Sequence, residues 1–302
     1  AFVLERALVL QTEADILAAM SLEALQGSAV PFDARIHEIR PHKGQLAVAR
    51  NVRELLRHSE ILDSHRDCGR VQDPYCLRCV PQVHGASRDA LAYATGVIET
   101  ELNSVTDNPL VFDNGDIISG GNFHGQPLAL ALDFAAMALA ELASISERRT
   151  YLLLGGHDGL PKLLMKDTGV NSGFMMPQYT AAALVSENKV LCHPASVDSI
   201  PTSLGQEDHV SMGSISALKL LTVLRNVECV LSVEFLTAAQ ALDFRAPLNP
   251  GHGVRVAHNM LREQIRHADR DYEVRNDLDT CAEILRRGDL ASIVKESVGG
   301  LA

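Results

Sequence analysis

The sequence predicts an all-α protein: a bundle of long helices with at most one small β-hairpin. Three observations support this. Of the 302 residues, 46% are hydrophobic but only 4% are aromatic and none is Trp, so the core must be aliphatic. Apolar residues recur at three- and four-residue steps, the spacing of one helix face. Two of these patterns, over residues 127–154 and 209–244, are much longer than an ordinary helix.

Charge and cysteine content narrow the class of protein. Lys and Arg total 27 against 38 Asp and Glu, a formal net charge of −11. Nucleic-acid binders and proteins of anionic membranes need basic patches, so we expect neither partner. Six Cys in a chain of this length do not indicate a disulfide scaffold, and we expect reduced thiols and a cytoplasmic location. Cys76 and Cys79 have redox or zinc spacing but lack the surrounding elements that either site needs.

The first third of the chain alternates helix and loop. Leu4, Leu8 and Ile16 share a face of a helix over residues 1–26, which Gly27 ends. A second, charged helical stretch is expected over residues 33–57, broken by a proline. Glycines and prolines through residues 63–87 predict a loop, and helix is expected to resume over residues 87–102.

The two longest patterns define the architecture. Asn114-Gly115 predicts a hairpin turn before Pro127, which suits the first turn of a helix over residues 127–154. The pattern over residues 209–244 is apolar nearly all round and would be about 54 Å long. Lys219 and other charged residues interrupt it too often for a membrane span. A buried helix of that length fits a bundle whose core is shared between subunits.

The remaining segments complete the bundle. A loop over residues 171–177 precedes a helix expected over residues 178–190, and a turn is expected over residues 247–253. The tail from Val254 is helical and highly charged, so we expect it at the surface. The predicted organisation is a central long-helix bundle over about residues 1–245 and a helical tail over about residues 246–302.

Polar side chains gather in three predicted loops, over residues 72–78, 120–125 and 203–209. Functional residues often lie on loops that rigid elements hold. An Arg binds a carboxylate in a bidentate way, and a phenol or a carboxylate can move a proton, so together these loops suit an amino-acid pocket. Structural roles are the alternative. Asp208 is a candidate N-cap and Phe123 a candidate core residue.

The same loops carry a resemblance to a known family. Gln72-Asp73-Pro74-Tyr75-Cys76-Leu77-Arg78-Cys79 with Pro81-Gln82-Val83 looks like a segment of histidine ammonia-lyases. Ser104-Val105-Thr106-Asp107-Asn108-Pro109, Gly121-Asn122-Phe123-His124-Gly125 and Gln206-Glu207-Asp208-His209-Val210-Ser211-Met212 match three further family motifs in the same order. The resemblance runs from about residue 1 to about residue 245. The glutamate at position 207 favours the histidine branch over the phenylalanine branch.

The resemblance implies a fold of the ammonia-lyase/fumarase-like type and an activity. These enzymes eliminate ammonia from L-histidine without oxidation to give trans-urocanate, using no metal. Their electrophile is a methylidene-imidazolone group formed from an internal Ala-Ser-Gly, and their homotetramers build each active site from several subunits. Arg78 would clamp the substrate carboxylate, and Gln72 would hydrogen-bond near the substrate. Tyr75 and Glu207 would be catalytic, and Phe123 would pack against the electrophile.

The sequence also departs from the family pattern. It contains no Ala-Ser-Gly; the nearest string is Ala86-Ser87-Arg88. The family's catalytic Tyr loop, a His and an Asn lie upstream of the position that matches Ala1, and Val80 replaces a common Gln. We therefore expect the chain to begin within the protein, to correspond to the C-terminal part of a subunit and to be inactive alone.

Two alternatives stay open. A fumarase/aspartase-type lyase shares the long helices, but Ser172-Gly173-Phe174-Met175-Met176-Pro177-Gln178-Tyr179 lacks the Lys of that family's mobile loop. A non-catalytic helical assembly fragment would need no pocket, and it would leave Arg78, Tyr75 and Glu207 scattered.

Overall fold

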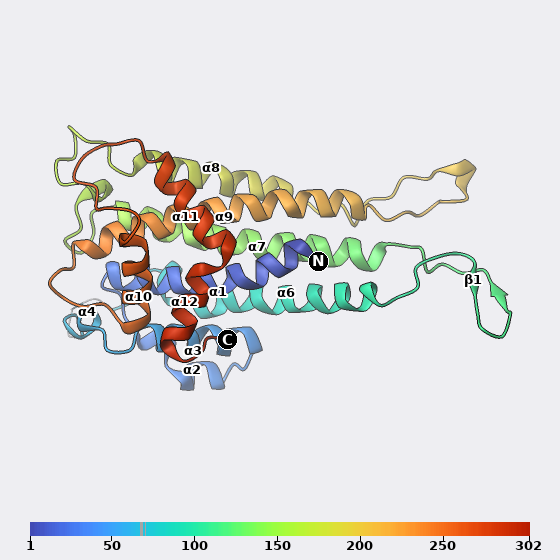
Figure 1. The fold of residues 1–302 in the computed structure, drawn as a ribbon, viewed down its shortest axis with the longest axis horizontal. Helices are drawn as coiled ribbons and strands as arrows, with labels where there is room; N and C mark the ends of the chain where they lie inside the picture. The colour runs from blue at the N-terminus through green and yellow to red at the C-terminus, as the bar shows by residue number, and fades with distance from the viewer. Residues whose placement is uncertain (67–68, 70) are drawn as a thin grey trace.

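The computed structural model describes residues 1–302 except 67, 68 and 70, so Cys68 lies outside the described residues. The described chain is a bundle of α-helices with one two-stranded sheet, which confirms the predicted all-α class (Figure 1). The helices are α1 (Phe2–Ala24), α2 (Ala34–Glu38), α3 (Lys43–Leu55), α4 (Glu60–Asp63), α5 (Tyr75–Arg78), α6 (Val80–Leu102), α7 (Gln126–Leu154), α8 (Met175–Leu191), α9 (Gly213–Asp243), α10 (His252–Arg262), α11 (Arg275–Arg287) and α12 (Asp289–Val298). Three short 3₁₀ turns join them: η1 (Val30–Phe32), η2 (Lys162–Leu164) and η3 (Ser203–Gly205).

The longest helices form the centre of the bundle. α7 has 29 residues and α9 has 31, and they pack along each other with α6 and α1 beside them (Figure 1). Their buried faces are aliphatic, as the composition predicted. Phe32, Phe174 and Phe235 are the aromatic residues among the largest fully buried side chains, beside many Leu, Ile and Ala. Small alanines on α7 allow neighbouring helices to approach closely.

The predicted loop over residues 63–87 was wrong in its second half. α5 occupies Tyr75–Arg78, and α6 begins at Val80 rather than at Ser87. Pro81 does not break this helix because it lies in the first turn, where its missing N–H costs nothing. Gly85 is a packing residue, since a Cβ there would lie 2.4 Å from the backbone nitrogen of Gln45 on α3.

Other helix boundaries also differ from prediction. α9 begins at Gly213 with Met212 as its N-cap, so the suggested N-cap role of Asp208 was wrong. α8 begins at Met175 and accommodates Pro177 in its first turn. The C-terminal helices are not only surface elements. They are amphipathic, and they bury side chains such as Leu261, Leu285 and Leu290 against the core.

Two segments project from one end of the bundle. β1 (Leu110–Val111) pairs antiparallel with β2 (Ile117–Ile118), as the hairpin turn at Asn114-Gly115 predicted, and Gly115 adopts a φ of 89°. The segment between α8 and α9 extends from the same end, whereas α4 and α10 lie at the opposite end (Figure 1). The two ends of the bundle are therefore about one long helix apart.

Within the described residues, α7 is long and apolar enough to cross a membrane, judged by length and composition. In the fold, 56% of that apolar window is buried. α7 also carries Asp133, Glu147 and Arg149 at buried positions, where each contacts other protein groups. Its apolar character is thus that of a core helix.

Candidate active site

Tyr75 and Arg78 lie on one face of the short helix α5. A three-residue spacing places two side chains next to each other on a helix. The guanidinium carbon of Arg78 is 4.7 Å from the ring centroid of Tyr75, a cation–π contact. Tyr75 is 71% exposed in the single chain. Arg78 makes no ion pair with any described residue, and its Nε is buried without a hydrogen-bond partner there.

The inward side of α5 is fixed to the bundle. Cys76 and Leu77 are buried, and Nη1 of Arg149 donates to the Cys76 carbonyl oxygen at 3.5 Å. Just before α5, the Asp73 carboxylate accepts the backbone N–H of Ser28 at 2.6 Å. Because one side of this turn is held by the core, Tyr75 is exposed on the other side, and the half-buried Arg78 lies over its ring.

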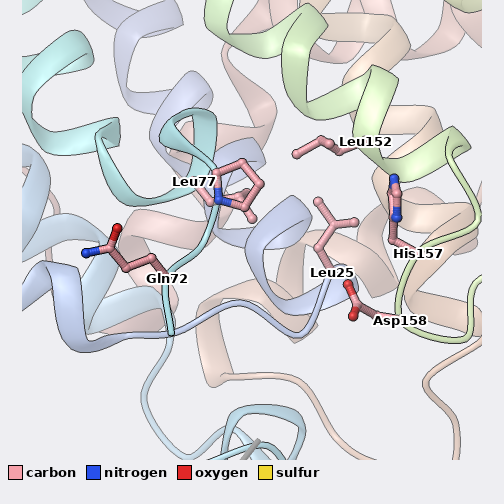
Figure 2. A pocket seen from close by; sticks show the side chains of 7 residues that line it. Leu25, Gln72, Leu77, Leu152, His157 and Asp158 are labelled. Carbon is pink, nitrogen blue, oxygen red and sulfur yellow. The ribbon is translucent and has the colours of Figure 1, made fainter. Parts of the chain in front are cut away.

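Gln72 lines a pocket beside α5. The pocket has a volume of about 320 Å³ and is lined by Leu25, Gln72, Pro74, Leu77, Leu152, His157 and Asp158. Figure 2 shows Gln72 on one side, His157 and Asp158 on the other, and leucine side chains between them. A pocket of this size and mixed lining is at the small end of ligand sites. Gln72 lies three residues before Tyr75 in the chain, and we call Gln72, Tyr75 and Arg78 the first cluster.

Phe123 and Glu207 lie at the other end of the bundle, on two segments that the contact of His124 with His209 joins, and we call these two residues the second cluster. Phe123 is 59% exposed, so its suggested place in the core was wrong. Glu207 is exposed and lies in a tight turn in which the backbone N–H of Thr202 donates to the Glu207 carbonyl oxygen at 3.0 Å. The Thr202 hydroxyl donates to the Glu207 carboxylate at 3.5 Å, which leaves most of that carboxylate open to solvent.

One chain does not bring the two clusters together. The second cluster lies just before α7 begins at Gln126, whereas the first cluster contacts Arg149, 23 residues further along the same helix. At 1.5 Å per residue this is a separation of about 35 Å. Gln72, Tyr75 and Arg78 therefore cannot meet Phe123 or Glu207 of the same chain around one small substrate.

A buried charged network lies behind the first cluster. Arg149 and Glu234 are both fully buried, and Asp15 contacts His84 at 2.7 Å and Arg88 at 3.0 Å. Burial lowers the pKa of His84, which keeps its ring neutral near neutral pH. Burial opposes ionisation of Asp15, but the hydrogen bond from His84 and the charge of Arg88 outweigh it and lower the pKa of Asp15.

Sequence reasoning did not single out this network. A signal was present in part, because Glu234 is an isolated charge inside an otherwise apolar helical pattern, whereas Arg149 follows Glu147 and Arg148 directly. Such charges remain in a core only when they are paired. The structure gives no indication of a metal site in the described residues. Among them, no group of three or more His, Cys, Asp or Glu is arranged to hold a metal ion.

Comparison with known proteins decides the family. The profile of the aromatic amino acid lyase family matches residues 1–263. The chain belongs to this family. Among curated relatives of this lyase chain, histidine ammonia-lyase of Sorangium cellulosum is 55% identical over 309 residues, covering 100% of this chain and 60% of the relative. Histidine ammonia-lyase of Gloeobacter violaceus is 52% identical, covering 100% of this chain and 59% of the relative.

Solved structures show the same fold. The crystal structure of histidine ammonia-lyase from Trypanosoma cruzi aligns with a TM-score of 0.90 at 44% identity, over 98% of this lyase chain and 56% of that chain. Tyrosine aminomutase from Streptomyces globisporus aligns with a TM-score of 0.91 at 37% identity, over 98% and 60% respectively. Because proteins with different names share this fold, the fold alone does not identify the substrate. The family match argues against the fumarase/aspartase alternative.

The lyase chain spans about 60% of the length of the curated relatives named above. Its 302 residues include no Ala-Ser-Gly, the tripeptide from which the family's methylidene-imidazolone forms. The residues that are present fit the binding side of such a site, because they offer a guanidinium, a phenol and an exposed aromatic ring rather than an electrophile.

Proposed function

We propose that this chain supplies substrate-binding and proton-moving groups to an enzyme that eliminates ammonia from L-histidine to give trans-urocanate. The observation that carries the proposal is the first cluster, in which Arg78 is held over Tyr75 with a buried Nε that has no protein partner among the described residues. A guanidinium with open donors is suited to bind the carboxylate of an amino acid in a bidentate way. The identity to histidine ammonia-lyases supports histidine as that amino acid.

Each residue of the first cluster has a separate role in binding the substrate or in moving its proton. Arg78 binds the carboxylate and so fixes the α-carbon in place. The Tyr75 phenol ring lies next to the Arg78 guanidinium, and its hydroxyl moves a proton at the reacting centre. Gln72 offers both an amide donor and an amide acceptor at the pocket beside α5.

Phe123 and Glu207 come from a second copy of the chain. In that copy they lie at the end of the bundle opposite to its own first cluster. Glu207 presents an exposed carboxylate that contacts the imidazole or the leaving ammonia. Phe123 presents an exposed ring that packs against the electrophile. The methylidene-imidazolone, when present, would draw electron density from the substrate; the chain itself contains no Ala-Ser-Gly from which it could form.

A shared site requires a homo-oligomer, and we propose a tetramer. The separation of about 35 Å between the clusters is bridged only if neighbouring copies run in opposite directions. Large apolar side chains support the proposal, because they are exposed along the long helices and the projecting segments. They include Leu102, Val105, Val111, Ile117, Val197, Leu204 and Leu218. Solvent-exposed apolar side chains in such numbers mark a surface that another protein covers.

Urocanate formation from L-histidine tests the proposal. The full-length protein is expected to convert L-histidine to a product with urocanate absorbance, and the 302-residue chain alone is expected to show no turnover. Adding the N-terminal part of the protein to the chain should restore activity if the two parts associate. A full-length protein that is inactive on L-histidine would overturn the substrate assignment, and turnover by the purified chain alone would overturn its dependence on an external electrophile.

A further inference from the structure

His124 joins two segments that are far apart in the sequence. Its Nε2 lies 3.0 Å from the carbonyl oxygen of His209, and its Nδ1 accepts the backbone N–H of Gln126 at 3.3 Å. The two histidine rings are stacked, with centroids 5.6 Å apart and an interplanar angle of 29°. His124 follows Phe123 directly, and His209 lies two residues after Glu207. The contact therefore joins the two segments that carry the residues of the second cluster.

The two hydrogen bonds select one state of the ring. A carbonyl oxygen can only accept, so Nε2 of His124 must carry the hydrogen that points at His209. Nδ1 must then be the unprotonated nitrogen, which matches its acceptance of the Gln126 N–H. A neutral imidazole satisfies both partners at once.

The segment with Glu207 has few other attachments near its tip. Its base is tied to α7, since the Asp133 carboxylate accepts the Ser196 N–H at 2.8 Å and the Gln126 side chain donates to the Ser196 carbonyl at 2.8 Å. Further out, the Thr202–Glu207 turn bonds only to itself. In the described part of the chain, the His124–His209 bond is the one hydrogen bond between residues 200–211 and the chain outside the segment between α8 and α9.

Close packing of Gly125 against the Ser211 side chain supports the same attachment. Gly125 lies so near Ser211 that a Cβ on the glycine would be 2.9 Å from the serine oxygen. The chain on both sides of His124 is therefore fitted to the chain just after His209, and the hydrogen bond fixes the register between them.

We infer that His124 is a positioning residue that sets the place of the Glu207 carboxylate through the backbone of His209. This inference rests on the proposed function. His124 itself does not touch the substrate; its ring holds the turn from which Glu207 projects. Misplacement of a reacting group by about 1 Å can cost about a hundredfold in rate.

Two substitutions separate the roles of the ring nitrogens in the full-length enzyme. In His124→Asn, the side-chain amide reaches the position of Nδ1 and still accepts the Gln126 N–H, but it is too short to donate to His209. In His124→Gln, the amide nitrogen reaches the position of Nε2 and keeps that donation. His209→Ala is the matched control, because it removes the stacked ring and keeps the carbonyl acceptor.

We expect kcat for urocanate formation to fall about 10- to 100-fold in His124→Asn, with KM for histidine changed by less than about threefold because Arg78 is untouched. His124→Gln and His209→Ala should stay within about fivefold of wild-type kcat. The inference is overturned if His124→Asn keeps wild-type kcat, or if the Asn and Gln variants lose it equally. Wild-type enzyme inactive on histidine would instead overturn the proposed function.

Discussion

Arg149 and Glu234 form a bidentate ion pair between α7 and α9 in the centre of the bundle. Nε of Arg149 lies 2.5 Å from one carboxylate oxygen and Nη2 lies 2.8 Å from the other, and neither side chain is exposed. The Ser21 hydroxyl of α1 donates to the same carboxylate at 2.6 Å. Since Arg149 also reaches the Cys76 carbonyl, this pair connects three long helices with the turn that carries Tyr75 and Arg78.

Removing one partner of this pair should destabilise the protein strongly. Glu234→Ala leaves the Arg149 guanidinium buried without its counter-charge, which costs about 3–5 kcal/mol in the free energy of unfolding. Arg35→Ala is the control, because Arg35 pairs with Asp33 at the surface with 85% of its side chain exposed. Urea unfolding followed by circular dichroism should show a much lower midpoint for Glu234→Ala and an unchanged midpoint for Arg35→Ala. Equal midpoints would contradict a structural role for the buried pair.

Two glycines on α6 should respond in opposite ways to the same substitution. A Cβ on Gly85 would lie 2.4 Å from the Gln45 backbone of α3, so Gly85→Ala forces the helices apart. Gly96 is on the same helix with no atom near the added Cβ, and Gly96→Ala should stabilise the helix by about 0.5–1 kcal/mol. Thermal unfolding should show a lower midpoint for Gly85→Ala and an equal or higher one for Gly96→Ala. A Gly85→Ala variant as stable as wild type would contradict the close packing of α3 on α6.

The buried Glu23 should make stability fall as pH rises. Burial raises its pKa from 4.5 to about 7, although the Ser59 side chain and the Gly251 N–H oppose the shift. Its protonated form is therefore the one that suits the fold. The stabilisation is complete below pH 4.5 and is lost as pH rises through 7, about 3 kcal/mol in all.

Glu23→Gln removes this titration. Between pH 5 and pH 8, wild type should lose more unfolding free energy than the Gln variant, and the difference should follow the pKa of Glu23 near 7. Urea titrations at several pH values measure it. Parallel pH profiles for the two proteins would show that Glu23 is not the group that titrates.

Arg78 should be required for the reaction in the full-length enzyme. Arg78→Ala removes a bidentate carboxylate contact, and kcat/KM for histidine should fall about a hundredfold or more. Arg78→Lys should recover little of the loss, because an ammonium group cannot reproduce the planar pair of donors. A non-catalytic assembly role predicts nearly unchanged kcat/KM for both variants, and steady-state kinetics distinguishes the two.

The sequence predicted helices well where the apolar pattern continues over many residues. The patterns over residues 1–26 and 127–154 became α1 and α7 with almost the same bounds, because many apolar positions specify one helix face. Residues 63–87 were mispredicted because Pro81 and Gly85 were treated as breakers. In the fold, the proline is in a first turn and the glycine is at a helix crossing. Only tertiary packing distinguishes such positions from a loop.

The sequence indicates candidate site residues, whose roles stay predictions, but it could not indicate their geometry. Motif resemblance pointed to Gln72, Tyr75 and Arg78. The structure places Arg78 over the Tyr75 ring and Gln72 in the lining of a pocket beside α5, and the roles of all three stay predictions. The distance of this cluster from Phe123 and Glu207 could not be predicted, because it depends on the helix between them running straight through the bundle. The His124–His209 bond could not be predicted either, since it joins loops 85 residues apart.

Mixing two inactive variants tests the shared site most directly. Arg78→Ala and Glu207→Ala of the full-length protein should each have little activity on L-histidine. Co-expressed in equal amounts and allowed to assemble randomly, they should regain activity at about one site in four, because a site with Arg78 from one copy and Glu207 from another can then be intact. If each active site were built within one chain, every site would lack one group, and the mixture would remain as inactive as its parents.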